Sequence, residues 1–233
     1  MRITNVRHLY QVTFMPHLFP VNCYLVEEGD HLILVDAAMP YSAKAIIKAA
    51  DKIGKPIKKI IITHAHSDHV GALDDLTEAL PCVEVLISER EAKLLSGDTS
   101  LEKEEKSPIK GGVPKKIKTR PSSLLKEGDK VGSLEVVYAP GHTPGMIALL
   151  DERDQSLIAG DAIQNRGGLA VSGDLRISFP FPALATWDKQ VAIETAEKLM
   201  ELEPSMLAVG HGSLLENPVD LVQQAIERAK RKG

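Results

Sequence analysis

Three histidines and one aspartate crowd into residues 64–69 of this chain, which read HAHSDH. A hydrophobic core has no use for such a cluster, because each buried imidazole needs a hydrogen-bond partner and a buried carboxylate loses its hydration. Imidazole and carboxylate groups are instead ligands of zinc, iron and manganese. The segment therefore predicts a metal site, although the ligand types do not choose the metal.

The surrounding sequence predicts how this cluster is positioned. Residues 58–62 read KKIII, a buried-strand pattern, and an amphipathic helical pattern follows the cluster. The cluster is thus expected on a loop between a strand and a helix. On such a loop His64 and His66 can converge on one metal, while Asp68 and His69 turn toward a second.

Further polar residues end other apolar strand patterns, namely Asp36 in LVDAA, His142 in APGHTPG, Asp161 in LIAGDA and His211 in AVGHG. Residues 24–37 and 147–162 echo each other, because each reads as a hairpin whose second strand ends in aspartate. This echo predicts an internal two-fold repeat, with two β-sheets packed together, helices outside and polar residues at one edge. Residues 42–53 show an apolar helical stripe, and Gly54 supplies its stop.

The HAHSDH segment matches the H-x-H-x-D-H signature of the metallo-β-lactamase superfamily, and the later histidines and aspartates follow in that family's order. The chain resembles this family from about residue 21 to residue 213. The resemblance implies an α/β (α+β) fold, a four-layer αββα sandwich of two mixed β-sheets with outer helices. It also implies one domain over residues 1–233.

Carried over by position, the family pattern implies two divalent metal ions and assigns their ligands: His64, His66 and His142 to the first, Asp68, His69 and His211 to the second, and Asp161 to both. Zinc is expected first, with iron or manganese as alternatives. The resemblance also implies that Asp36 orients a ligand histidine. A hydroxide bridging the metals would attack a carbonyl carbon, and Asp68 would be the catalytic residue that passes a proton to the leaving group.

The apolar loop 14–20 lies in a place where members of this family often cover the site, and a second apolar loop, 177–187, follows Asp161. Their aromatic residues are candidates for the wall of a substrate pocket, or alternatively for the core: Phe14, Phe19, Phe179, Phe181 and Trp187. Such a wall predicts a substrate with an apolar portion, and the resemblance to N-acyl homoserine lactonases, which share the ligand set and apolar cover loops, implies a lactone or other carboxylic ester.

Comparison with branches of the family narrows this expectation. The bridging position holds Asp161, where the common zinc β-lactamases carry cysteine. Glyoxalase II thioesterases share the ligands but add a helical domain, whereas only 22 residues follow His211 here. Many N-acyl homoserine lactonases carry tyrosine shortly after the bridging aspartate, and this chain reads Ala162-Ile163-Gln164. The expected function is a dinuclear metal-dependent hydrolase of a lactone or ester. A glyoxalase II-like thioester hydrolase is the alternative, and a catalytically inactive metal-binding protein is a minor one.

Composition limits the partners. With 28 basic and 32 acidic residues the net charge is −4, which argues against a nucleic-acid partner, and no apolar run is long enough to span a membrane. The first residues lack the apolar region of a signal peptide, which predicts a cytoplasmic protein that acts on a small molecule. A homodimer is implied only by resemblance to the lactonases.

Three remaining features carry less specific expectations. Cys23 and Cys82 fit no metal or redox spacing and are expected as small buried residues in strands. Residues 97–121 are charged and interrupted by prolines and glycines, so they are expected to form an insert. This insert is either a solvated loop or a functional lid or partner surface.

Overall fold

The computed structural model describes residues 1–232, and the chain divides into two compact units. The N-terminal unit comprises Met1–Asp98 and Val113–Leu125. The C-terminal unit comprises Thr99–Gly112 and the chain from Lys126 onward. Each unit contains one large mixed β-sheet with helices, which confirms the predicted α/β (α+β) fold class. A single domain over residues 1–233 stays a prediction.

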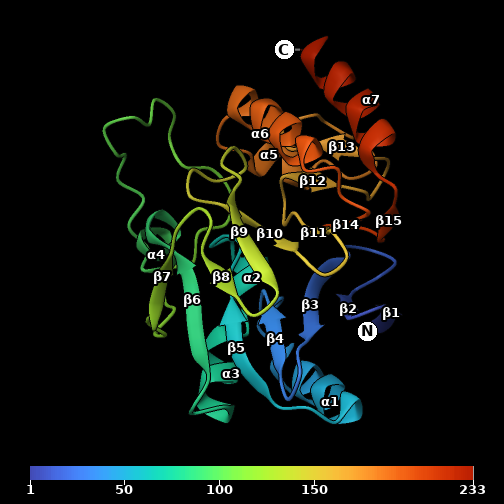
Figure 1. Ribbon diagram of the computed structural model, residues 1–233. Helices are drawn as coiled ribbons and strands as arrows, with labels where there is room; N and C mark the ends of the chain where they lie inside the picture. The colour runs from blue at the N-terminus through green and yellow to red at the C-terminus, as the bar shows by residue number, and fades with distance from the viewer. Residues whose placement is uncertain (233) are drawn as a thin grey trace. The chain divides into compact units, whose positions relative to one another are not determined.

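A seven-stranded sheet in sequence order forms the N-terminal unit (Figure 1). Its strands are β1 (Arg2–Val6), β2 (Leu9–Phe14), β3 (Val21–Glu27), β4 (Leu32–Val35), β5 (Ile57–Ile61), β6 (Glu84–Ser88) and β7 (Ser123–Leu125). Strands β1 to β4 pair antiparallel, and β4 to β7 pair parallel. Parallel neighbours need crossover connections. Those connections hold α1 (Ala43–Ile53), α2 (Ser67–Val70), α3 (Leu73–Ala79) and α4 (Glu89–Leu95).

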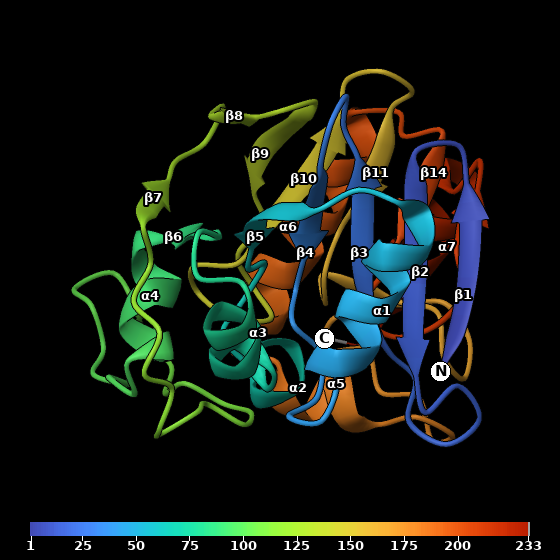
Figure 2. The ribbon, with the colours of Figure 1, turned by 90° about the horizontal axis from the view of Figure 1, so that it is seen from below.

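The helix expected over residues 42–53 is confirmed as α1, which lies beside α3 (Figure 2). Ile46, Ala49 and Ala50 of the apolar stripe are buried, and its other two residues, Ala45 and Ile53, are half-buried. Gly54 ends the helix with φ +84°, and its N–H donates to the Ala50 carbonyl. Glycine suits this position because a left-handed residue with a side chain is strained.

The C-terminal unit holds a six-stranded sheet in the order β15-β14-β11-β10-β9-β8. Its strands are β8 (Lys130–Val131), β9 (Leu134–Tyr138), β10 (Ile147–Asp151), β11 (Ser156–Ile158), β14 (Met206–Ala208) and β15 (Leu215–Glu216). A two-stranded ribbon pairs β12 (Ile163–Gln164) with β13 (Ala170–Val171). The helices are α5 (Phe181–Ala185), α6 (Lys189–Glu201) and α7 (Val219–Lys230).

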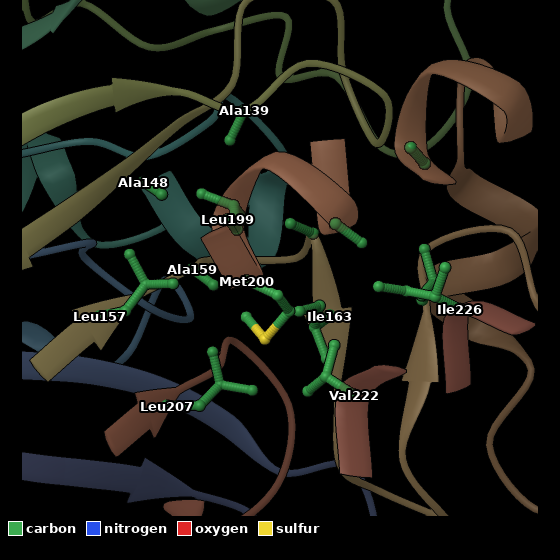
Figure 3. Packing of buried hydrophobic residues seen from close by; sticks show 14 of the residues in the cluster. Ala139, Ala148, Leu157, Ala159, Ile163, Leu199, Met200, Leu207, Val222 and Ile226 are labelled. Carbon is green, nitrogen blue, oxygen red and sulfur yellow. The ribbon is translucent and has the colours of Figure 1, made fainter. Parts of the chain in front are cut away.

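Apolar side chains from α6, α7 and the sheet form one buried cluster in this unit (Figure 3). Leu157 of β11 and Leu207 of β14 meet Met200 of α6, and Val222 and Ile226 come from α7. Burial of such side chains contributes roughly 1.5–3 kcal/mol each. This packing fixes the strands whose ends carry the polar residues.

The sequence echo corresponds to a repeated strand topology. In one unit β3 and β4 form an antiparallel hairpin and β4 pairs parallel with β5. In the other, β10 and β11 form the hairpin and β11 pairs parallel with β14. The carboxyl ends of two parallel neighbours lie at the same sheet edge. Asp36 therefore follows the strand next to the one preceding His64, and Asp161 follows the strand next to the one preceding His211.

The structure also tests the predictions for the two cysteines and for the insert. Cys23 is buried in β3 as predicted, but the prediction for Cys82 is wrong, because this residue is exposed in the turn after α3. The structure describes all of residues 97–121, and they form no helix or strand. The prolines and glycines in this segment disfavour regular structure. No helix within residues 1–232 is long and apolar enough to cross a membrane.

Candidate metal centre

The N-terminal unit gathers five of the predicted site residues, here called the N-terminal cluster: Asp36, His64, His66, Asp68 and His69. Asp36 follows β4, His64 and His66 lie on the loop after β5, and Asp68 and His69 lie in α2. The His64 ring centroid is 4.9 Å from that of His66 and 4.2 Å from that of His69. All three imidazoles are buried. The structure thus places His64 and His66 on the predicted strand-to-helix loop, whereas Asp68 and His69 lie in the short helix that follows it.

Asp36 accepts hydrogen bonds that connect several residues at this cluster. Its Oδ1 accepts the Thr63 N–H at 2.8 Å, and its Oδ2 accepts the Thr63 hydroxyl at 2.8 Å and lies 2.9 Å from His69 Nδ1. A carboxylate only accepts, so Nδ1 of His69 carries the proton and Nε2 carries the lone pair. The Thr63 hydroxyl has donated its one proton to Asp36, so its oxygen, 3.1 Å from His64 Nδ1, accepts from that nitrogen. One carboxylate therefore fixes two histidines in the tautomer that binds metal through Nε2.

Backbone contacts hold α2 against the segment that follows β4. The Ala37 N–H donates to the His69 carbonyl at 2.6 Å, and the Gly71 N–H donates to the Ala38 carbonyl at 2.8 Å. A Cβ on Gly71 would lie 2.6 Å from the backbone nitrogen of Pro40, so this approach requires glycine. The position of His69 thus depends on Gly71, which has no side chain to bind a metal or a substrate.

Three of the predicted site residues belong to the C-terminal unit and form the C-terminal cluster: His142, Asp161 and His211. They follow β9, β11 and β14, and all three are buried. Asp161 Oδ2 lies 3.4 Å from His142 Nε2 and 3.1 Å from His211 Nε2. Two atoms bound to one metal at about 2.0 Å in tetrahedral geometry lie about 3.3 Å apart. The spacing within each of these two imidazole–carboxylate pairs therefore suits two ligands of one divalent metal.

A chain of hydroxyls sets the tautomer of His142. Thr186 Oγ1 donates to the Pro182 carbonyl at 2.7 Å, one turn earlier in α5. Its proton is then committed, so Thr186 Oγ1 accepts from Ser172 Oγ at 2.9 Å. Ser172 Oγ in turn accepts from His142 Nδ1 at 2.8 Å. His142 consequently directs the lone pair of Nε2 toward Asp161.

The five aromatic pocket candidates occupy different surroundings. Phe179 is buried with its ring centroid 5.3 Å from that of His211, and Phe181, half exposed, packs edge-on against Phe179. Trp187 is buried, and its indole N–H donates to the Ser107 carbonyl. In the other unit Phe14 is buried at the end of β2 and Phe19 is half-buried. A common wall of all five stays a prediction.

Sequence reasoning missed the residues that support these ligands. Thr63, Ser172 and Thr186 orient imidazoles, and buried Glu91 of α4 accepts the Ala65 N–H at 2.8 Å through Oε2, which fixes the loop between His64 and His66. Serine and threonine are common residues, so nothing in the sequence marks Ser172 or Thr186 as partners of a histidine. Thr63 alone had a signal, because it directly precedes the cluster.

Both clusters fit divalent metal by the chemistry of their donors. One potential donor atom from each of Asp36, His64 and His69 lies within 4.8 Å of the other two. His64, His69 and His142 each have the lone pair on Nε2, because Nδ1 is bonded to a carboxylate or a hydroxyl. This is a common arrangement for histidines that bind metal. The structure thus supports the ligand types, while the full assignment of seven ligands to two metals stays a prediction.

Known proteins resemble the chain over nearly its whole length. A family model described as the metallo-beta-lactamase superfamily matches residues 17–211. The uncharacterized protein YobT of Bacillus subtilis (strain 168) is 54% identical over 232 residues, 99% of this chain and 100% of YobT. The probable metallo-hydrolase YflN of the same organism is 32% identical over 218 residues, 82% of this chain and 80% of YflN. The family resemblance is thereby confirmed.

Solved structures share the fold. DIM-1 metallo-beta-lactamase, in crystals exposed to ceftazidime, aligns with a TM-score of 0.73 at 15% identity, over 100% of this chain and 97% of that one. At this identity the match shows the fold alone. TTHA1623 in a di-iron-bound form aligns with a TM-score of 0.67 at 25% identity, over 91% of this chain and 96% of that one.

Proposed function

The chain belongs to the metallo-β-lactamase superfamily and is a metal-dependent hydrolase, and we propose that it cleaves a lactone or other carboxylic ester with an apolar portion at a centre of two metals. One observation carries the proposal. His64, His69 and His142 are each held through Nδ1 by an acceptor, so that Nε2 has the lone pair. Metal-ligating histidines are commonly held in this way, with one ring nitrogen bonded to an acceptor and the other presented to the metal.

We assign the ligands by family membership: His64, His66 and His142 hold one metal, Asp68, His69 and His211 hold the other, and Asp161 contacts both. Zinc is the first choice, because imidazole and carboxylate form its common catalytic sites. Iron is the alternative, supported by the di-iron-bound form of TTHA1623. Manganese also accepts this ligand set.

When bound, the metal pair supplies Lewis acidity toward the carbonyl oxygen and lowers the pKa of water. The residues of the chain do the rest. Asp68 is partly exposed at 26% of its side chain, and its Oδ2 lies 3.9 Å from His69 Nε2. A carboxylate that reaches solvent from beside a ligand can take a proton and deliver it to the leaving oxygen. The buried imidazoles position the metals and keep bulk water from the ligand atoms.

The aromatic pair Phe179 and Phe181 supports a substrate with an apolar portion. Phe179 lies against His211, and the half-exposed Phe181 extends this apolar surface outward. Exposed Ile177 and Leu184 flank the pair in sequence. An acyl chain would bury these side chains at about 25 cal/mol per Å² of apolar surface.

The test measures bound metal and acid release in one preparation. A long-chain N-acyl homoserine lactone and S-lactoylglutathione serve as oxygen-ester and thioester substrates. We expect about two metals per chain and lactone opening, both reduced in His142→Ala and Asp161→Ala and unchanged in the exposed-residue control His8→Ala. Thioester cleavage alone would instead establish the glyoxalase II-like alternative. Bound metal without cleavage of either substrate, or full turnover by Asp161→Ala, would overturn the proposal.

A further inference from the structure

The second half of the insert and the five residues after it carry a strong local positive charge. Residues 106–126 contain seven lysines and arginines and no aspartate or glutamate, in a chain whose net charge is −4. Like charges concentrated in one segment raise the local concentration of anions. The charge of this segment therefore points to an anionic ligand, which the ester chemistry proposed above does not explain.

Asp74 of α3 anchors residues 118 and 119 of this segment within the N-terminal unit. Its carboxylate accepts the Thr119 N–H at 2.8 Å, the Thr119 hydroxyl at 2.6 Å and the Lys118 N–H at 3.0 Å. Burial alone raises the pKa of Asp74, but these hydrogen bonds outweigh burial and leave the pKa below its usual value. Asp74 is thus ionised at neutral pH, and charge-assisted bonds hold the segment in place.

This anchored segment walls a cavity of about 330 Å³. Pro114, Lys115, Lys116 and Ile117 line it from the insert, and Pro40, Ser67, Val70 and Gly71 line it from the segment after β4 and from α2. The lining is mostly apolar, with two lysines. Both lysine residues are exposed, and no acidic residue among residues 1–232 forms an ion pair with either. We call this cavity the basic pocket.

We propose that the basic pocket binds an anionic group, such as a carboxylate, carried by the substrate. The inference rests on the proposed function and names a feature of its substrate class. Two lining residues, Ser67 and Val70, bracket Asp68 and His69 in α2, so the pocket lies within about one helical turn of those ligands, roughly 5 Å along the axis. Lys115 and Lys116 supply the countercharge, and the apolar lining takes the carbon chain that carries the anion.

The kinetic test follows phenol release from two aryl esters that differ at the far end of the succinyl chain: an aryl hemisuccinate, which ends in a carboxylate, and its methyl ester, which is neutral. The Lys115→Gln/Lys116→Gln variant is compared with Lys44→Gln/Lys48→Gln, which removes two exposed lysines from α1. We expect the first variant to raise KM for the anionic ester about tenfold and to leave KM for the neutral ester unchanged, since the variant removes two exposed charge pairs with the anion only. The effect should shrink as salt is added. The α1 variant should match the wild type.

A binding measurement separates this inference from the proposed function. Succinic acid monoanilide and its neutral primary amide, N-phenylsuccinamide, neither of which contains an ester bond, are titrated into wild-type protein and both variants by calorimetry. We expect tighter binding of the anionic anilide, lost about tenfold only in Lys115→Gln/Lys116→Gln. No binding of the anilide, or binding that ignores these two lysines, overturns the inference. Lysine-dependent binding without cleavage of any ester would overturn the proposed function and leave the basic pocket standing.

Discussion

Asp36 Oδ2 lies 2.9 Å from His69 Nδ1, although the two residues belong to different elements. Asp36 adopts φ +63° at the end of β4, a left-handed conformation that turns the chain after the strand. The same carboxylate accepts from both the backbone and the hydroxyl of Thr63. A single side chain thereby joins the ends of β4 and β5 to α2, so metal binding depends on a residue that touches no metal in our assignment.

We expect Asp36→Asn to lower metal affinity by about 10- to 100-fold with little change in secondary structure. Asparagine tolerates the left-handed backbone, so the change removes charge and acceptor capacity rather than the turn. Competition with a chromogenic chelator gives the affinity, and circular dichroism reports the fold. Asp51→Asn, an exposed change on α1, is the control. Unaltered affinity in Asp36→Asn would show that the contact does not orient a ligand.

The hydroxyl chain at His142 gives a prediction that needs no metal. In metal-free wild-type protein, ¹⁵N spectra should show the proton on His142 Nδ1. Ser172→Ala removes its acceptor, so we expect the proton to redistribute toward Nε2 and metal affinity to fall by about 10- to 100-fold. Thr186→Val should act in the same direction, while Thr186→Ser keeps the hydroxyl and should behave as wild type. Identical imidazole spectra in all four proteins would contradict the tautomer assignment.

Gly71→Ala tests the close approach of α2 to the segment after β4. The new Cβ would meet the Pro40 backbone, which cannot move as a side chain can, so we expect a loss of about 1–3 kcal/mol in unfolding free energy. Urea denaturation measures it. Gly29→Ala is the matched control, because a Cβ there meets nothing within 4 Å. Equal midpoints for the two variants would mean that α2 is free to shift.

Residue spacing was sufficient to predict the strand-to-helix loop, α1 with its Gly54 stop and the two hairpins ending in aspartate. These features are local, and periodicity carries local information. The supporting network was not predictable, because Ser172 and Thr186 meet His142 only through folding of distant segments. The exposure of Cys82 was missed for a related reason: its apolar neighbours suit a strand, but Pro81 and Cys82 form the turn before β6.

Asp174 ties the C-terminal helix to the segment that carries Ser172. Its side chain is fully buried, and it accepts from Arg228 Nε of α7 at 3.0 Å and from Lys232 Nζ at 2.7 Å. Burial alone raises the pKa of Asp174, but the bonds from Lys232 and Arg228 lower it further than burial raises it. The folded-state pKa is therefore below that of the unfolded chain, about 3.9.

A carboxylate with a depressed pKa stabilises the fold above its unfolded pKa, and this contribution is lost as the pH falls through the folded value. We therefore expect Asp174→Asn to lower unfolding free energy at pH 7 by about 1–3 kcal/mol, the range for a hydrogen bond between charged groups. The difference from wild type should stay constant down to about pH 5 and shrink below pH 4. Urea denaturation at pH 7, 5, 4 and 3 measures the unfolding free energies. The control is Asp220→Asn, which changes an exposed residue of α7. A difference that grows on acidification would mean that Asp174 does not act as an ionised partner of α7.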